Sequence, residues 1–139
     1  MKYRIGDVYE VDFPYADGSV QNGKRPAVIV QNNLGNRKSR NLIVFPITSK
    51  IKKVGQVTHV ILDKDCGLPQ TSMALCENPV TVTKDRVGEY LTTLSNSDMR
   101  RIARANLLSM STVSFLQPNE VTEVIFQAKK LNNSACYVV

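Results

Sequence analysis

The segment PAVIVQNNLGNRKSRNLIVFPIT, residues 26–48, holds two apolar runs with a polar stretch between them. Residues 26–31 and 41–48 are rich in the β-branched and aromatic side chains that favour strands, and the first run is typical of a central strand. Residues 32–40 contain Gly35 and several asparagines, which predict a loop. Pro46 has no N–H to donate to a neighbouring strand, so it predicts a sheet edge or a bulge.

Further short strands are predicted on both sides of this segment. Residues 8–13 alternate between apolar and polar side chains, as a half-buried strand does. Residues 57–62, 72–76, 80–83 and 90–94 are also β-rich, and residues 15–24 have the composition of a long hairpin loop. No helix separates one strand from the next, so the order predicts a small, curled antiparallel sheet.

Two helices are predicted after the sheet. Apolar residues recur at helical spacing from Met99 to Met110, and residues 95–98 supply side chains that cap a helix start. Pro118 interrupts the chain, and Asn119 is the expected cap of a second helix that ends near Leu131. Residues 135–139 are compatible with a strand or with part of a partner-binding surface.

Length and composition restrict the kind of protein. The 139 residues, 42% of them hydrophobic, suit one globular domain. The sequence shows no membrane span and no signal peptide, so a cytoplasmic location with no membrane contact is expected. Cys66, Cys76 and Cys136 have spacings that fit neither a disulfide framework nor a zinc site. The single histidine, His59, is expected to face outward from its strand.

Charge is distributed unevenly along the chain. The net charge is +6, and eight basic residues lie between Lys24 and Lys53, whereas the nearest acids are Asp17 and Asp63. Independently solvated loop charges would give the same count. The separation of the two signs nevertheless favours an anionic partner for this stretch.

Several kinds of catalysis are disfavoured by the motifs present. The sequence contains no phosphate-binding Gly-rich loop and no His-Glu-x-x-His motif. RNA cleavage needs none of these, because the 2′-OH of the substrate can attack the adjacent phosphorus. The enzyme then has to stabilise the negative phosphorane, for which a guanidinium and a hydroxyl are suitable donors. Arg25 and Thr48 are the candidates, although an arginine and a threonine alone do not distinguish catalysis from surface decoration.

The order of several short motifs resembles the MazF/PemK/Kid family of toxin endoribonucleases. The matching stretches are GDVYEVD at 6–12, GSVQNGKRP at 18–26, PITSK at 46–50, THV at 58–60, GL at 67–68, and TLS at 93–95, together with Ser72, Glu77 and Arg86. The resemblance spans roughly residues 3 to 111.

This resemblance implies a mainly β fold with C-terminal helices, an SH3-like barrel, and usually a homodimer. It implies cleavage of single-stranded mRNA without a metal or other cofactor, giving a 2′,3′-cyclic phosphate and a 5′-OH, and control by a cognate antitoxin. Arg25 and Thr48 are the implied catalytic pair. The expected RNA-binding residues are Ser19, Gln21, Lys24, Ser49, Lys50, Lys52, Lys53, Ser72, Glu77 and Asn78.

Residues 1–111 are expected to form the barrel domain with its helix. Residues 112–139 are expected to be a helical extension of the same domain, which adds a helix, widens the dimer interface or occupies the antitoxin groove. Val20 stands where the family often has Glu, and Asn78 stands where Gln is common. A non-catalytic RNA- or protein-binding barrel, or a gyrase-directed toxin of related fold, are the alternatives. The sequence does not indicate an RNA sequence preference.

Overall fold

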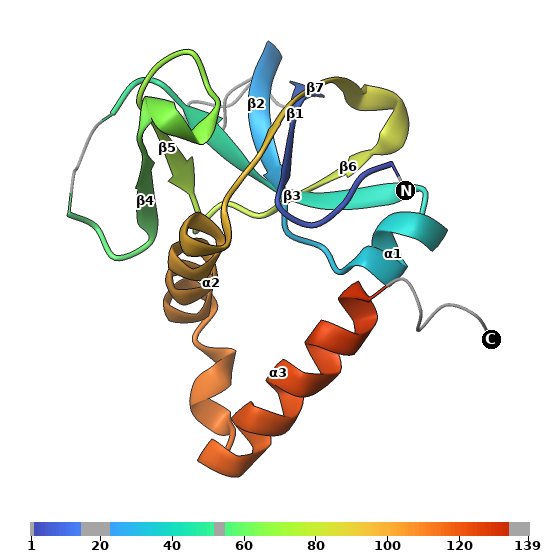
Figure 1. Cartoon of the computed structure of the whole chain (residues 1–139), viewed down its shortest axis with the longest axis vertical. Helices are drawn as coiled ribbons and strands as arrows, with labels where there is room; N and C mark the ends of the chain where they lie inside the picture. Colours follow the sequence, from blue (N-terminus) through green and yellow to red (C-terminus); the bar gives the residue numbers. More distant parts are fainter. Residues whose placement is uncertain (1, 15–22, 52–54, 134–139) are drawn as a thin grey trace.

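The computed structural model describes residues 2–14, 23–51 and 55–133. Its sheet contains β1 (Asp7–Phe13), β2 (Gly23–Ile29), β3 (Asn41–Thr48), β4 (His59–Leu62), β5 (Ser72–Leu75), β6 (Val80–Thr83) and β7 (Val87–Thr93). The strands pair antiparallel in the order β4-β5-β3-β2-β1-β7, with β6 also on β3 (Figure 1). The mainly β architecture with C-terminal helices is confirmed. The pairing begins at β4 and ends at β7, so the sheet is curled and not closed.

Strand β3 lies at the centre of this sheet. One edge pairs with β2, and the other pairs with β6 up to Val44 and with β5 from Ile47 onward. Pro46 falls between those two partners and is itself buried opposite Ala27. The predicted edge or bulge is thus a change of partner within a central strand, which tolerates the missing N–H of proline.

Apolar side chains are buried on both faces of the sheet. On one face, Val8, Val28 and Phe45 pack in a cluster that also includes Ile102. On the other face, Ile29 and Val44 belong to a second cluster drawn from β1, β2, β3 and β6. Because both faces are covered, residues 26–31 and 41–48 read as nearly continuous apolar runs.

The helix α2 (Asn96–Met110) follows the sheet as predicted and covers it with Ile102 and Ala105. Its cap is Ser95, whose hydroxyl accepts a hydrogen bond from the Asp98 N–H. The described part of the chain also contains the 3₁₀ turns η1 (Lys64–Cys66), η2 (Lys84–Arg86) and η3 (Thr112–Phe115). In the residues that the structure describes, no helix is long and apolar enough to cross a membrane.

Residues 32–40, expected to be a loop, contain the short helix α1 (Asn33–Lys38). The Asn32 side chain accepts a hydrogen bond from the Gly35 N–H at 2.8 Å and so caps this helix. The prediction was wrong because six residues are too few to show a helical period, and because asparagine occurs in caps as well as in loops.

The extension forms helix α3 (Pro118–Asn132), which is followed by residues outside the described range. Its cap is Gln117, not the expected Asn119, and Glu120 accepts a hydrogen bond from the Gln117 N–H at 2.9 Å. Pro118 is favourable at the first helical position because that position needs no N–H partner. Cys136 and the expected segment 135–139 lie outside the described residues.

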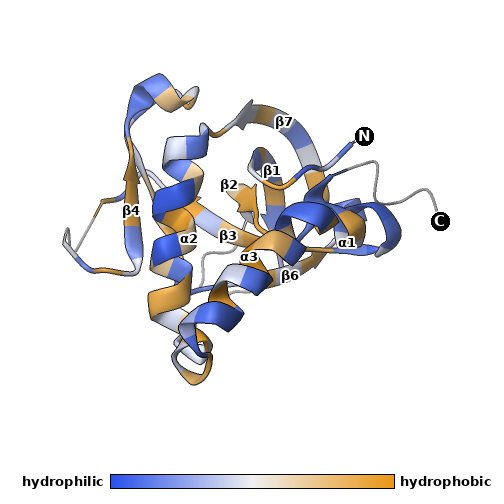
Figure 2. Ribbon diagram, turned by 60° about the horizontal axis from the view of Figure 1, so that its bottom comes forward, coloured by the Kyte–Doolittle hydropathy of each residue, from blue (hydrophilic) through white to orange (hydrophobic). Residues whose placement is uncertain are grey.

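The last residue of α3, Asn132, is hydrogen-bonded to α1. The Asn33 N–H donates to the Asn132 side chain at 3.0 Å, and the Asn33 amide donates to the Asn132 carbonyl at 3.1 Å. Asn33 is buried, and its own side-chain oxygen accepts from the Ile5 N–H at 2.7 Å. Elsewhere α3 projects from the sheet, and Val124, Ile125 and Phe126 remain exposed (Figures 1 and 2).

Candidate active site

Arg25 lies near the beginning of β2, where it pairs with Val11 of β1. The side chain is half-buried, and its Nε atom is buried with no hydrogen-bond partner among the described residues. Buried donors in folded proteins are nearly always paired. An unpaired guanidinium N–H therefore suits a site whose partner arrives with a ligand.

Thr48 is the last residue of β3 and is buried, with 4% of its surface exposed. Its Oγ1 accepts a hydrogen bond from the Lys50 N–H at 3.0 Å. Because a hydroxyl can accept and donate at once, the Thr48 O–H remains available as a donor. The Lys50 N–H thereby holds the hydroxyl oxygen in place and leaves the hydroxyl proton free for another hydrogen bond.

The strand register relates these two residues. Val28 pairs with Phe45 and Ala27 pairs with Pro46, and the observed pairing of β2 with β3 ends at this second pair. Two more steps in the same register would place Arg25 across from Thr48. Residues opposite each other in antiparallel strands present their side chains on the same face, so the spacing favours one shared site.

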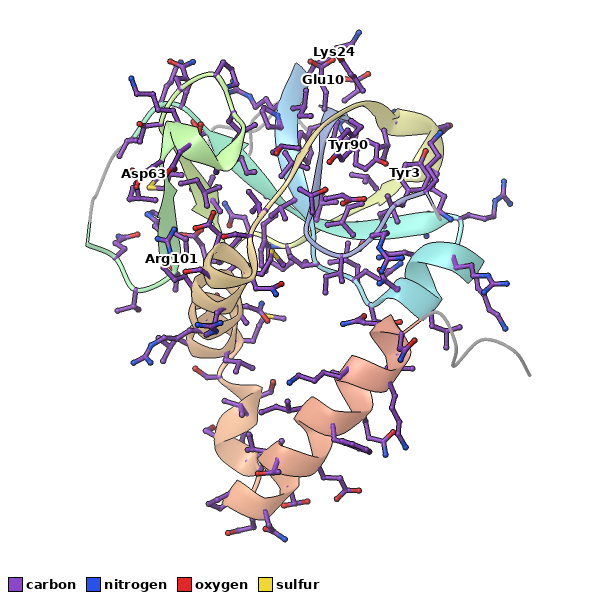
Figure 3. All side chains as sticks on the ribbon, viewed as in Figure 1. Tyr3, Glu10, Lys24, Asp63, Tyr90 and Arg101 are labelled. Carbon is purple, nitrogen blue, oxygen red and sulfur yellow. The ribbon has the colours of Figure 1, made fainter. Side chains whose placement is uncertain are left out.

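A cavity of about 230 Å³ lies at this end of β2 and β3. It is bounded by the ends of the two strands and by the segment that leads into β5. Its lining residues are Lys24, Arg25, Pro26, Ile47, Ser49, Leu68, Pro69, Gln70 and Ser72. Thr48 is not itself in the lining, although both of its chain neighbours are. Lys24 marks this end of the molecule in Figure 3, remote from α3.

Among the described residues, the lining has two cationic side chains, Lys24 and Arg25, and no carboxylate. Such a cavity attracts anions, because low-dielectric walls concentrate the field of like charges. Its volume is below the range of about 300–1,000 Å³ typical of small-molecule sites. It therefore suits one anionic group of a longer chain better than a whole free ligand.

The structure brings four of the predicted residues together here, namely Lys24, Arg25, Ser49 and Ser72. Gln70 also lines the cavity, and sequence reasoning missed it because residues 67–69 suggested only a turn. The Gln70 carbonyl accepts a hydrogen bond from the Ser72 hydroxyl at 2.9 Å, which orders this wall. Lys50 is exposed beside the cavity, outside its lining.

Glu77 and Asn78 lie elsewhere, in the turn between β5 and β6. Glu77 contacts His59, whose side chain is only 9% exposed. The prediction that His59 faces outward was therefore wrong, because a partner 18 residues away leaves no trace in the local pattern. The expected RNA-binding residues Ser19, Gln21, Lys52 and Lys53, and also Val20, lie outside the described residues.

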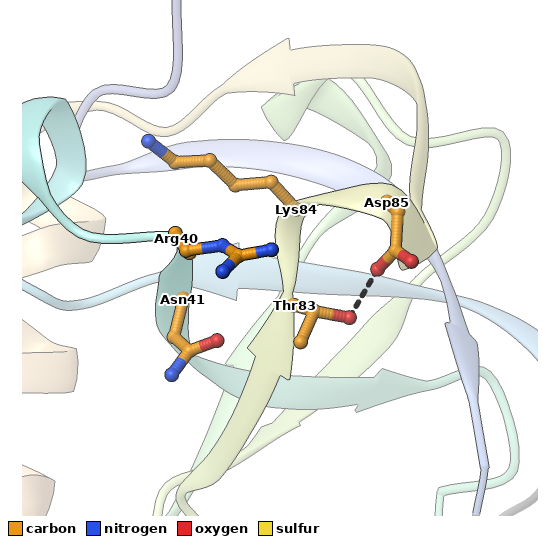
Figure 4. A pocket seen from close by; sticks show the side chains of 5 residues that line it. All are labelled: Arg40, Asn41, Thr83, Lys84 and Asp85. Carbon is orange, nitrogen blue, oxygen red and sulfur yellow. Dashed lines mark hydrogen bonds between the residues drawn. The ribbon is translucent and has the colours of Figure 1, made fainter.

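A larger cavity of about 550 Å³ lies at the opposite end of β3 (Figure 4). Its lining consists of Arg40, Asn41, Thr83, Lys84 and Asp85, and the Thr83 hydroxyl donates to the Asp85 carboxylate. This cavity contains an acid and none of the predicted site residues. We therefore place the candidate site by its chemistry and not by cavity size.

Within residues 2–14, 23–51 and 55–133, no group of three or more histidine, cysteine, aspartate or glutamate side chains is arranged to hold a metal ion.

Comparison with known proteins identifies the family. Residues 4–109 match the family described as the PemK-like, MazF-like toxin of type II toxin–antitoxin systems. Endoribonuclease EndoA of Bacillus subtilis is 37% identical over 116 residues, covering 83% of this chain and all of that protein. Endoribonuclease MazF of Staphylococcus saprophyticus is 41% identical over 108 residues, covering 77% of this chain and 90% of that protein.

Solved structures agree with the sequence comparison. An endoribonuclease in complex with its cognate antitoxin, from a mycobacterial species, superimposes with a TM-score of 0.67 at 25% identity. The match covers 79% of this chain and 96% of that one. Residues 4–109, which match the family, contain the sheet and nearly all of α2, whereas α3 begins after them. The chain belongs to the PemK-like, MazF-like toxin family of type II toxin–antitoxin systems.

Proposed function

We propose that this protein is a sequence-selective endoribonuclease toxin that cleaves single-stranded mRNA. The observation that carries the proposal is the cavity at the ends of β2 and β3, whose described lining residues include no acid. The unpaired Nε of Arg25 belongs to that lining, and Thr48 stands between two lining residues. Relatives that share over a third of their residues with this chain are named endoribonucleases, which supports the same reaction class.

In the proposed reaction, the 2′-OH of one nucleotide gives up its proton to water and attacks the adjacent phosphorus. The 5′-oxygen of the next nucleotide leaves and takes up a proton from water. The products are a 2′,3′-cyclic phosphate and a 5′-OH. Arg25 donates hydrogen bonds to the non-bridging oxygens, whose negative charge grows in the transition state. Thr48 donates its remaining O–H to the same centre. We assign both residues to charge stabilisation, because neither is a base at neutral pH.

The surrounding residues position the RNA backbone. Lys24 adds positive charge inside the cavity, and Lys50 adds it beside the cavity. Ser49, Gln70 and Ser72 offer neutral hydrogen-bonding groups along the path of the chain. Ser19, Gln21, Lys52 and Lys53 remain predicted RNA contacts. No bound metal is required in this mechanism, because the substrate supplies its own nucleophile.

Regulation follows from the chemistry of the site. The similar mycobacterial endoribonuclease was solved in complex with its cognate antitoxin, and we propose such a partner here. An acidic, disordered segment would bind the same basic cavity and exclude RNA. We propose also that the toxin acts as a homodimer in the cytoplasm, where mRNA is available.

Product chemistry tests the proposed reaction. Purified protein in EDTA should cleave a single-stranded RNA and leave fragments with a cyclic phosphate and a 5′-OH. An RNA with one 2′-deoxynucleotide on the 5′ side of the cleavage site should resist cleavage at that site only. Cleavage of the deoxy-substituted bond, or products with a 5′-phosphate, would contradict attack by the 2′-OH.

A further inference from the structure

The turn between β5 and β6 is bonded to the start of β4. The Cys76 N–H donates to the Thr58 carbonyl at 3.0 Å, and the Asn78 N–H donates to the Leu75 carbonyl at 3.2 Å. These backbone bonds place Glu77 beside His59, the first residue of β4. We call the turn residues Glu77 and Asn78 the corner.

Two side chains hold the Glu77 carboxylate. The His59 Nε2 atom lies 2.5 Å from Glu77 Oε2, and the Thr58 hydroxyl donates to the same oxygen at 3.3 Å. The His59 side chain is 9% exposed and the Glu77 side chain 31%. A hydrogen bond to a charged group is stronger than a neutral one, especially where water is largely excluded. The bond therefore fixes the carboxylate and the turn that carries it.

The pair leaves two buried polar atoms without partners, Glu77 Oε1 and His59 Nδ1. The described part of the chain contains one further buried side-chain atom of this kind, Arg25 Nε. Buried polar groups without partners are rare, and each one calls for an explanation. Two of the three atoms belong to the pair of His59 and Glu77, and the third belongs to the candidate catalytic arginine.

The corner is separate from the cavity but connected to it by β5. Ser72 lines the cavity at the beginning of β5, and Asn78 lies six residues further along the chain. At about 3.3 Å per residue, the two are at most about 20 Å apart. An RNA chain whose scissile phosphate occupies the cavity can therefore present a neighbouring base to the corner.

We propose that His59 is a positioning residue that sets base selectivity at the corner, and this inference rests on the proposed function. His59 holds Glu77, and Glu77 and Asn78 together offer hydrogen-bond acceptors and a donor to the edge of an unpaired base. His59 does not contact the scissile phosphate. Its loss thus changes which RNA is chosen more than how fast a bound RNA is cleaved.

The test compares His59→Leu with His59→Gln in cleavage of a random-sequence RNA library, with the cleaved ends sequenced. His59→Leu removes the donor to Glu77, and it should relax the preference at one base position by about tenfold, the scale of one lost base-edge contact. On the preferred RNA it should raise KM more than it lowers kcat. His59→Gln retains an N–H of similar reach and should restore much of the preference.

Two controls separate positioning from folding. Gln56→Ala changes an exposed residue of the preceding segment and should leave the preference unchanged. In a Glu77→Ala background, His59→Leu should cause no further change in preference, because its effect is exerted through Glu77. If His59→Leu folds poorly, Thr58→Val, which removes only the 3.3 Å bond, should shift the preference in the same direction by a smaller amount.

A second library of uncleavable 2′-O-methyl RNA, selected by binding, reports the preference without cleavage. An unchanged preference in His59→Leu, in either library, would overturn the role of His59. So would a uniform loss of kcat at every sequence with KM unaltered. Absence of cleavage by the wild-type protein, with selective binding that His59→Leu alters, would instead overturn the proposed reaction and leave the role of His59 supported.

Discussion

The site-bearing strands and helix α3 are held in place by different interactions. In β3, Phe45 is 1% exposed, and its neighbours Val28 and Ile47 are equally buried. In α3, Phe126 is 59% exposed, and the bonds to α1 are made by the final residue, Asn132. The site therefore depends on hydrophobic burial. The position of α3 depends on the two hydrogen bonds between Asn33 and Asn132, which we call the clasp.

The difference between these two regions follows the boundary of the residues that match the family. Residues 4–109, which match the family, contain the whole core and every proposed catalytic residue. Helix α3 lies after them; Figure 2 colours parts of it as hydrophobic, and its residues Val124, Ile125 and Phe126 are exposed. We therefore expect the site to be stable without help from α3, and the role of the extension is a separate question.

Removal of a core side chain should have the largest effect on stability. Phe45→Ala should lower the free energy of unfolding by about 3–5 kcal/mol, because a buried aromatic ring is replaced by a cavity. The matched control is Phe115→Ala, since Phe115 is 88% exposed and its loss should change stability by no more than about 0.5 kcal/mol. Urea denaturation followed by circular dichroism measures both, and equal effects would refute the assignment of the core.

Opening the clasp should affect α3 alone. Asn132→Ala leaves the buried Asn33 N–H without its side-chain partner, which costs about 1–3 kcal/mol. Hydrogen exchange should then accelerate in residues 118–132 and stay slow in β2 and β3. Asn119→Ala, at the exposed start of α3, is the control. Faster exchange throughout the sheet would show that the extension supports the whole fold.

The two described cysteines should differ in reactivity. Burial raises the pKa of the Cys76 thiol to about 12, and the nearby Glu77 carboxylate adds to the rise. At pH 8.5 folded Cys76 should be alkylated at least about a hundredfold more slowly than half-buried Cys66, because the thiolate is the reactive form. Mass spectrometry of a Cys136→Ser variant would show this. Similar rates at both thiols would show that the corner region opens readily.

The raised pKa of the Cys76 thiol also determines how the stability of the fold changes with pH. The unfolded thiol ionises near pH 8.5, whereas folded Cys76 stays neutral until about pH 12. Its contribution to stability is complete below the unfolded pKa and is lost as the pH rises through that interval. Denaturation midpoints should therefore fall at alkaline pH, and less steeply in Cys76→Ala.

Removal of a positive charge from the cavity should weaken RNA binding, whereas removal of one from α3 should not. Lys24→Ala should weaken RNA binding and reduce the slope of log K against log salt by about one, because one phosphate contact is lost. Lys129→Ala removes an equally exposed cation from α3 and should leave the slope unchanged. Fluorescence anisotropy from low to moderate salt measures both. An equal change in the two variants would indicate diffuse attraction and no defined site.

The sheet was largely predictable from sequence. The apolar runs at 26–31 and 41–48 formed neighbouring strands, because their length and β-branched content carry that information locally. Helix α2 was also predicted, since 15 residues show a clear period. Helix α1 was missed because it is too short to show a helical period. The cap of α3 was placed two residues late because asparagine is a preferred cap residue, whereas glutamine is not.

The site was predictable only in part. The order of motifs pointed to Arg25 and Thr48, and the structure places Arg25 and both neighbours of Thr48 around one cavity. Gln70 was missed because it reaches the cavity through tertiary packing of a turn. The pairing of His59 with Glu77 was missed for the same reason, because two residues 18 positions apart meet only when β4 and β5 pair.

The central claim, that Arg25 stabilises the phosphorane, is tested most directly by single-turnover cleavage of RNA in EDTA. Arg25→Ala should slow cleavage by about 10²–10³-fold, the usual effect of losing one donor to a developing negative charge. Arg25→Lys should recover little, since an ammonium lacks the planar fork of donors. Arg40→Ala, in the cavity at the other end of β3, should cleave like the wild type. A folded Arg25→Ala protein that cleaves at the wild-type rate would contradict the account.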